Sequence, residues 1–294
     1  MITISKLFEE YFELVSYSQA SHTIVTKKSI YNKHIKPRFS SFDINDLKYK
    51  DFQLFVNDLL KSGLRPKTVK NIKDLLQVVY KTALKLEYTD KNPLVLVDLP
   101  RFDNKIHFNY PLEYQEKFIK AILSFDEPIY SEIFFFLLHG RRLSEVLSLE
   151  WSMIDLSQQI YFIPAKINKA KRSMQYKMTK HLHSVLNKRF YDLIMKDEIP
   201  SGYVFKSPKT GTKFVDLRKP WKRLLKKANL PHCRIHDIRH LVATYSINHL
   251  EIPIEKVSHT LGHTSIEVTQ KYITANPETA KDVIESLIDS VIKN

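Results

Sequence analysis

Apolar residues recur at helical spacing through the first 100 residues of this 294-residue chain, and a stretch with three prolines then breaks the pattern. That stretch is KNPLVLVDLPRFDNKIHFNYPLEYQEKF. Proline lacks a backbone N–H and interrupts regular elements, so several prolines in one segment indicate a connection between domains. We therefore predict a helical domain over residues 1–104 and a second domain over residues 105–294, with its first helix opening near Pro111.

Four amphipathic stretches in the first domain predict four helices, which together would form a small bundle. Three of them are SKLFEEYFELV, HTIVTKKSIYNKHIKPRF, which should end at Pro37, and DLKYKDFQLFVNDLLKSG, which should stop at Gly63. The clearest is RPKTVKNIKDLLQVVYKTALKLE. Its apolar positions at helical spacing are Val69, Ile72, Leu75, Leu76, Val79, Tyr80 and Ala83.

The second domain is predicted to mix helices with a few short strands. It begins with the helical patterns LEYQEKFIKAIL and IYSEIFFFLLHG. Strand signals follow in SMIDL, QQIYFIP and SMQYKMT, the last two flanking the lysine-rich turn AKINKAKR. Helical periodicity resumes at HLHSVLNKRFYDLI. The predicted fold class is therefore mainly α with a small antiparallel β-sheet (α+β).

The chain is strongly basic, with 46 Lys and Arg against 32 Asp and Glu and a formal net charge of +14. Residues 1–100 hold 16 basic and 11 acidic side chains, a surplus of five, so the rest of the chain carries a surplus of nine. The excess is spread over both domains and is not a basic tail. This balance suggests a polyanionic partner, most often nucleic acid, although a merely soluble basic protein would also fit.

Several function classes are disfavoured by what the sequence lacks. A single cysteine, Cys233, excludes an intramolecular disulfide framework and fits a reducing cytoplasm. The N-terminus has no signal-peptide pattern, and the longest apolar run, IFFFLL, is far too short to span a bilayer, so no membrane partner is expected. No two glycines are spaced to form a phosphate-binding loop, so no nucleotide or other cofactor is expected.

Four clusters could carry chemistry. HCRIHDIRHL places His236, Arg239 and His240 on one face of a helix start. HGRRLSEVLSLEW puts Arg142 three residues before Glu145, although a surface ion pair is the commoner fate of such residues. The other two clusters are the basic turn, with Lys166, Lys169, Lys171 and Arg172, which alone could be a solvated turn, and LGHTSIEVTQKYI, with His263 and Tyr272.

The order of these clusters resembles that of the tyrosine recombinases, or phage integrases, whose catalytic domain carries Arg…Lys…His-x-x-Arg…His…Tyr. GRRLSEVLSLEW, HDIRH and LGHTSIEVTQKY are similar to the three boxes of that family, and the resemblance spans almost the whole chain. It implies an N-terminal four-helix SAM-like core-DNA-binding domain and a C-terminal catalytic domain. The residues matching the motif are Arg142, Lys169, His236, Arg239, His263 and Tyr272.

The resemblance also implies the role of each residue. Tyr272 would attack phosphorus and form a 3′-phosphotyrosyl bond, while Arg142 and Arg239 clamp the non-bridging phosphate oxygens. His236 would accept the tyrosine proton, and Lys169 would protonate the departing 5′-oxygen, with Lys166 as the alternative. The remaining expected contributions are a hydrogen bond from His263 to the phosphoryl group, orientation of the site by Glu145, and hydrogen bonds from His240.

The implied partners are double-stranded DNA with paired core half-sites and three further copies of the chain, in a homotetramer on two duplexes. Family members assemble tetramers on two duplexes by exchanging a C-terminal segment, and AKDVIESLIDSVIKN has the apolar stripe of such a helix. The expected location is the cytoplasm, at the nucleoid. Accessory proteins could take part in the assembly, and the sequence does not identify them. The expected activity is metal- and ATP-independent recombination, either integration and excision of a mobile element or Xer-type resolution.

Two other interpretations of the clusters stay open on the sequence. In a metal-dependent nuclease, His232, His236 and His240 would recur at i, i+4 and i+8 if that segment were helical, and with Cys233 they could bind zinc. A non-catalytic DNA-binding regulator would also explain the charge and the helices. Neither interpretation needs a tyrosine nine residues after His263.

Binding to a cognate DNA duplex should weaken steeply as salt rises, because two basic domains that together clamp the duplex would contact many phosphates and release their counterions. For six or more phosphate contacts, a fourfold rise in salt should cost about 1,000-fold in affinity or more. Fluorescence anisotropy on a labelled duplex measures this. An affinity that barely changes over that range would contradict a clamp formed by both domains.

Overall fold

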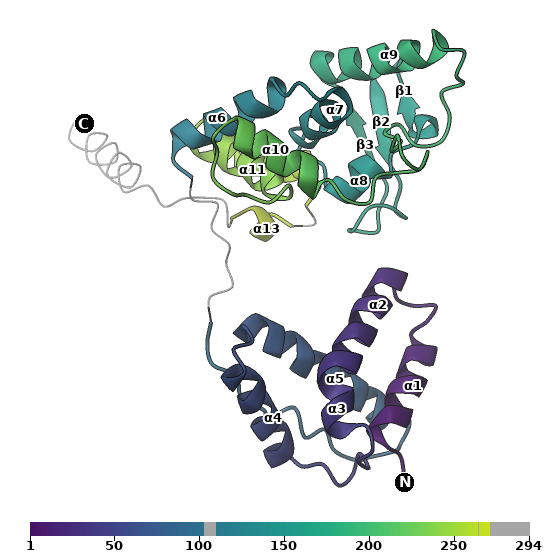
Figure 1. The fold of residues 1–294 in the computed structure, drawn as a ribbon, viewed down its shortest axis with the longest axis vertical. Helices are drawn as coiled ribbons and strands as arrows, with labels where there is room; N and C mark the ends of the chain where they lie inside the picture. The colour runs from purple at the N-terminus through teal and green to yellow at the C-terminus, as the bar shows by residue number, and fades with distance from the viewer. Residues whose placement is uncertain (103–109, 264, 271–294) are drawn as a thin grey trace, which may run out of the picture. The chain divides into compact units, whose positions relative to one another are not determined.

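The computed structural model describes residues 1–102, 110–263 and 265–270. The chain divides into two compact units, Met1–Ile106 and His107–Asn294 (Figure 1). The boundary expected from the sequence, between residues 104 and 105, lies outside the described residues. In the portion that is described, no helix is both long and apolar enough to cross a membrane.

The first unit is a helical bundle in which all four predicted helical stretches are present. Its elements are α1 (Ile4–Leu14), α2 (Ser21–Ile30), the π-helical turn η1 (Tyr31–Ile35), α3 (Lys36–Phe39), α4 (Tyr49–Lys61) and α5 (Pro66–Lys85). All seven apolar positions predicted on α5 are buried. Gly63 follows α4 with φ +84°, a backbone conformation that favours glycine, as expected for the residue after a helix end.

The second helical stretch does not end at Pro37, contrary to the sequence prediction. Helical structure continues through α2, η1 and α3 to Phe39, with Pro37 in the first turn of α3. The backbone N–H of Lys36 bonds to the carbonyl of Tyr31, five residues back, which is the wider π-type spacing. A proline ring clashes with the carbonyl of an ordinary α-helical turn, and the wider turn just before Pro37 accommodates it.

The proline-bearing segment is not a bare linker over its first part. Leu94 is 0% and Val97 4% exposed, and both pack in the core of the bundle. The Asn92 side chain donates to the carbonyl of Gln77 on α5 (3.1 Å), and the backbone N–H of Asp98 donates to the Gln53 side chain on α4 (2.8 Å). Burial of these apolar side chains outweighs the interruption by proline, so the bundle extends beyond its last helix.

The second unit surrounds a small antiparallel sheet with helices, as predicted. The strands β1 (Ile154–Asp155), β2 (Ile160–Ile163) and β3 (Met174–Lys177) follow in the order β1-β2-β3, and Ile160 pairs with Lys177. The helices are α6 (Leu112–Leu123), α7 (Pro128–Leu137), α8 (Leu143–Leu147), the 3₁₀ turn η2 (Trp151–Met153), α9 (Lys180–Ile194), α10 (Arg218–Lys227), α11 (Asp237–Asn248), α12 (Ile254–Leu261) and α13 (Glu267–Gln270).

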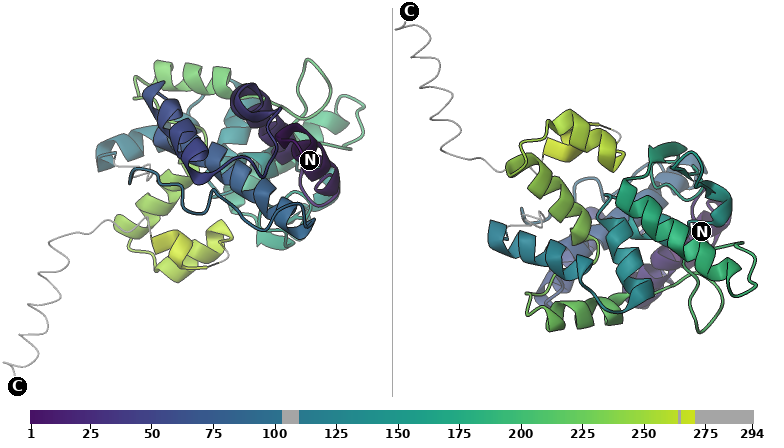
Figure 2. Two further views of the ribbon diagram at one scale, coloured as in Figure 1. Left: turned by 90° about the horizontal axis from the view of Figure 1, so that it is seen from below. Right: turned by 90° about the horizontal axis from the view of Figure 1, so that it is seen from above.

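One helix, α10, was not predicted. Its sequence RKPWKRLLKK is dominated by charge, yet Trp221, Leu224 and Leu225 all face the core and are buried. The indole N–H of Trp221 donates to the carbonyl of Cys233 (2.7 Å), which fixes the loop that enters α11. Figures 1 and 2 show α6 beside both α10 and α11. Through α6 and through the Trp221 bond, α10 helps to hold α11 in the unit.

Helix α5 offers two neighbouring valines that test the bundle core, because Val79 is 0% and Val78 41% exposed. We expect Val79→Ala to lower the free energy of unfolding by about 2 kcal/mol, through lost burial of two methyl groups and the cavity left behind. Val78→Ala removes the same atoms from an exposed face and should change it by less than about 0.5 kcal/mol. Urea unfolding followed by circular dichroism measures both; equal effects would contradict the described core.

Candidate active site

Arg142 is held by a buried carboxylate at the start of α8. Glu145 accepts a hydrogen bond from the Arg142 backbone N–H (2.9 Å) and another from its Nη1 (2.8 Å). The Glu145 side chain is 3% exposed and that of Arg142 20%. The three-residue spacing seen in the sequence therefore forms a partly buried ion pair that also caps the helix. The carboxylate fixes the guanidinium and leaves part of it accessible.

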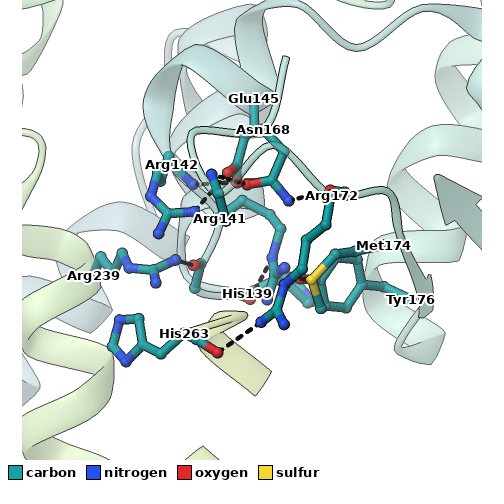
Figure 3. A network of polar contacts seen from close by, with 12 residues as sticks. His139, Arg141, Arg142, Glu145, Asn168, Arg172, Met174, Tyr176, Arg239 and His263 are labelled. Atoms are coloured by element: carbon teal, nitrogen blue, oxygen red, sulfur yellow. Dashed lines mark hydrogen bonds and ion pairs between the residues drawn. The ribbon is translucent and has the colours of Figure 1, made fainter. Parts of the chain in front are cut away.

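Arg239 reaches the same turn from α11. Its side chain is buried, and Nη1 donates to the carbonyl of Gly140 at 2.5 Å. Gly140 lies two residues before Arg142, so two arginines that are 97 positions apart in the sequence meet at the α7–α8 turn. Figure 3 shows their guanidinium groups close together on one side of that turn. Two adjacent forks of this kind suit the oxygens of one phosphate group.

His236 stands at the N-terminal cap of α11, next to this pair of arginines. Partial burial lowers its pKa below the ordinary value, although the residue as a whole keeps an exposed surface, and the positive charge of Arg239 lowers the pKa further. Arg142 contributes in the same direction. The imidazole is therefore neutral at neutral pH and can accept a proton. The ring of His240 packs edge-on against it at 5.4 Å between centroids.

His263 is fixed by a hydrogen bond that sequence reasoning missed. Its Nδ1 lies 2.6 Å from the hydroxyl of Thr269, which is completely buried on α13. Its backbone N–H bonds to the carbonyl of Ser258 (3.1 Å), within the turn that ends α12. Nothing in the sequence distinguishes Thr269 from its neighbours. Only the fold places its hydroxyl against the imidazole ring.

Gly262 makes the turn before His263 possible. It has φ +63°, and a Cβ built on it would lie 2.6 Å from the Tyr176 hydroxyl and 3.4 Å from Met174 Sδ. Strand β3 therefore approaches the end of α12 as closely as a hydrogen in place of a side chain allows. The ring of Tyr176 cannot easily retreat, because it stacks on Tyr161 with 5.4 Å between ring centroids.

Arg141 has a structural role distinct from that of Arg142. It is 2% exposed, and its guanidinium carbon lies 3.6 Å from the centroid of the Tyr176 ring. It also donates to the backbone carbonyls of His139 and Thr260, thereby tying the α7–α8 turn to α12. The sequence showed two adjacent arginines. The structure gives one to packing and leaves the other at the edge of the site.

The two candidate lysines lie in the hairpin between β2 and β3. Lys166 and Lys169 are both exposed. In the described part of the chain, no hydrogen bond or ion pair joins either lysine to the site arginines or histidines. The structure therefore brings together Arg142, Arg239, His236 and His263 with Glu145 and His240, and it leaves Lys169 on a neighbouring loop.

The histidine series considered for zinc is not formed, because α11 begins only at Asp237. His232 is exposed in the preceding loop, and Cys233 is buried. Burial, and secondarily the charge of Asp237, raise the pKa of the Cys233 thiol to about 12, which disfavours a thiolate ligand. Across the ranges that the structure describes, no three His, Cys, Asp or Glu side chains are grouped to hold a metal ion.

The expected nucleophile, Tyr272, lies outside the described residues. Tyr245 on α11 is half-buried, and its ring packs against His249 at 5.4 Å between centroids. The predicted exchange helix near the C-terminus also lies outside the described residues.

The chain thus combines a helical bundle with a unit that gathers arginines and histidines at one turn, a cluster suited to a phosphate group. Comparison with known families agrees. Residues 114–279 match the phage integrase family, and residues 3–60 match the phage integrase N-terminal SAM-like domain. The chain belongs to the phage integrase family and is a tyrosine-type site-specific recombinase.

Similar proteins include recombinases of two kinds. The XerC-like tyrosine recombinase of Caldanaerobacter subterraneus subsp. tengcongensis is 24% identical, with 99% of this chain and 84% of the relative covered. The ICEBs1 integrase of Bacillus subtilis (strain 168) is 27% identical, with 90% of this chain and 76% of the relative covered.

Solved structures share the fold. The Tn1549 transposon integrase in complex with a circular intermediate DNA superposes with a TM-score of 0.75 at 18% identity, covering 98% of this chain and 100% of that one. A lambda integrase tetramer bound to a Holliday junction gives a TM-score of 0.73 at 14% identity, covering 93% and 78%.

The close approach at Gly262 can be tested against Gly211, which has nearly the same φ (+66° against +63°) but no atom within 4 Å of the position that a Cβ would take. Gly211→Ala should cost only the left-handed strain, about 1–2 kcal/mol. Gly262→Ala should lose about 1 kcal/mol more, because its methyl group meets Tyr176. Adding Tyr176→Phe should restore part of that excess. Urea unfolding of these three variants and the unmodified protein measures this; equal losses in both single alanine variants would refute the close approach.

Proposed function

We propose that this recombinase cleaves and rejoins DNA strands through a 3′-phosphotyrosyl intermediate, with Tyr272 as the nucleophile. The proposal rests on one observation, which is the pair of anchored guanidiniums of Arg142 and Arg239 at one turn, beside two imidazoles. Positive charge that is fixed before the reaction stabilises the negative charge that develops on phosphorus oxygens, without reorganisation during the step.

In the proposed step, the Tyr272 oxygen forms a bond to phosphorus, and the bond from phosphorus to the 5′-oxygen breaks. His236 takes the phenolic proton, since its lowered pKa keeps it neutral and ready to accept one. Lys169 delivers a proton to the 5′-oxygen as it leaves. The phosphotyrosyl bond retains the energy of the phosphodiester, so a 5′-hydroxyl can reverse the step without ATP.

The remaining site residues act around this chemistry. His263 donates a hydrogen bond to the phosphoryl group, and its bond to Thr269 sets the orientation of the ring. Glu145 orients Arg142 through the ion pair and the helix cap described above. His240 steadies His236 by edge-on ring packing. The contacts within the turn support these roles.

The proposed substrate is double-stranded DNA with paired core half-sites, and the proposed assembly is a tetramer on two duplexes. The charge surplus in both parts of the chain supports DNA contacts from each. Related structures are described as a lambda integrase dimer bound to a core site and a tetramer bound to a Holliday junction. We propose that the C-terminal segment AKDVIESLIDSVIKN docks on a neighbouring subunit in this assembly.

The biological task is integration and excision of a mobile element or Xer-type resolution, since relatives of both kinds are similar to this chain. The two tasks leave different DNA on the enzyme. Sequencing the DNA trapped covalently on the protein in cells distinguishes element ends from a fixed chromosomal site.

Replacing Tyr272 with phenylalanine tests the proposed function. Phenylalanine keeps the ring and deletes the attacking oxygen, so Tyr272→Phe should bind DNA with unchanged affinity and form no covalent adduct on a nicked suicide substrate. Denaturing gel electrophoresis of the adduct, beside a gel-shift measurement of affinity, gives both values.

Tyr245→Phe is the matched control, because it deletes a hydroxyl from a half-buried tyrosine of the same unit. This variant should form the adduct at a rate close to that of the unmodified protein. An adduct that persists in Tyr272→Phe and disappears in Tyr245→Phe would transfer the nucleophile's role to Tyr245.

A further inference from the structure

The loop that carries Lys169 is closed by a buried asparagine. Asn168 is 6% exposed, and its side chain accepts from the backbone N–H of Ala170 (2.9 Å) and donates to the carbonyl of Arg172 (2.7 Å). Its own backbone carbonyl accepts from the N–H of Lys171 (2.9 Å). The backbone of Lys169 therefore lies inside a turn that Asn168 closes with Ala170, Lys171 and Arg172, while its side chain is exposed; Lys166 lies before this turn.

The same loop is tied to the turn that carries His263. Nη2 of Arg172 donates to the backbone carbonyl of His263 at 2.8 Å, across 91 positions of sequence. Figure 3 shows the Arg172 side chain extending from the hairpin to that carbonyl, with Asn168 bonded to the backbone of Arg172. This hydrogen bond is a direct link between the lysine loop and the cluster formed by His263, Arg142 and Arg239.

Such a link matters because Lys169 has a long, flexible side chain on an exposed loop. A hairpin loop without anchors moves more than the strands that it joins. A misplacement of about 1 Å at a reacting group can cost about 100-fold in rate. The Asn168 bonds set the shape of the loop, and the Arg172 bond sets where that shape lies relative to His263.

We propose that Arg172 is a positioning residue that anchors the Lys169 loop to the His263 turn, so that the proton donor is held at the leaving oxygen. This inference rests on the proposed function, in which Lys169 protonates that oxygen. Asn168 supports this anchor by holding the shape of the loop through its bonds to Ala170 and Arg172. An arginine in a basic hairpin could instead bind a DNA phosphate, and the experiment separates the two roles.

The test compares two DNA substrates in the same enzyme preparation. One is an ordinary suicide duplex, and the other has sulfur in place of the bridging 5′-oxygen, which leaves without a proton. On ordinary DNA, Arg172→Ala should slow adduct formation by about 10- to 100-fold, part of the effect of a general acid. On the sulfur substrate it should react within about threefold of the unmodified protein. Asn168→Ala should show the same pattern.

The matched control is Lys171→Asn, which removes a positive charge from the same loop without touching the anchor. Lys171 has φ +51°, a conformation that asparagine tolerates, so the loop should keep its shape. This variant should cleave both substrates at nearly the normal rate. Combining Arg172→Ala with Lys169→Ala should be no slower on ordinary DNA than Lys169→Ala alone, because both changes remove one proton delivery.

The outcomes separate the proposed anchor from a DNA contact. An equal deficit on both substrates, with weaker DNA binding and a smaller salt dependence, would make Arg172 a phosphate contact and overturn the anchor. An unchanged rate on ordinary DNA would overturn it as well. Two other outcomes would contradict the proposed function itself. In one, the unmodified protein forms no adduct on either substrate; in the other, the sulfur substrate does not rescue Lys169→Ala.

Discussion

The site depends on one short turn, the α7–α8 turn at Gly140, where three distant parts of the second unit converge. The Gly140 carbonyl accepts from Arg239 on α11, and a Cβ on this glycine would meet Leu261 of α12 at 2.7 Å. The neighbouring Arg141 adds a hydrogen bond to α12 and a cation–π contact with Tyr176 of β3. A guanidinium stays charged in any protein environment, so its partners must be built around it. Backbone carbonyls supply them here without neutralising the charge.

This arrangement explains how a cluster of positive groups can persist next to the core. Glu145 is the carboxylate that pairs with Arg142, and the bonds of Arg239 and Arg141 named above go to backbone carbonyls. The site therefore keeps a positive electrostatic field. Burial is the larger cause of the lowered pKa of His236, and the charge of Arg239 is the second. A phosphate group would be attracted by that field. The same interactions that hold the fold together thus also fix the guanidinium groups of Arg142 and Arg239 in place.

Much of the architecture could be predicted because it follows from local patterns. Helix α5 and the strands β2 and β3 appear where periodicity placed them, since burial of alternating or helical faces decides both. Helix α10 was missed because its charge hides a four-residue apolar face, and the packing of Leu94 and Val97 was missed because prolines surround them. The π turn before Pro37 depends on the path of the chain around the proline ring. In each of these places, the packing of the whole unit determines the local structure against the preference of the local sequence.

The sequence by itself determined the order of the chemical groups, the helical and strand segments, and the family to which the chain belongs. Ordered spacings such as that from Arg142 to Glu145 can be recognised in the sequence because both residues lie in one helical turn. The spacing to Glu145 already assigned Arg142 to the site; only the tertiary structure showed that Arg141 packs against Tyr176. Only the tertiary structure showed that Thr269 orients His263 and that Arg172 reaches the same turn from a hairpin. Those contacts join residues separated by up to 119 positions or depend on which face of an element is covered. Linear order carries no information about either, because proximity in space is set by the packing of the whole unit.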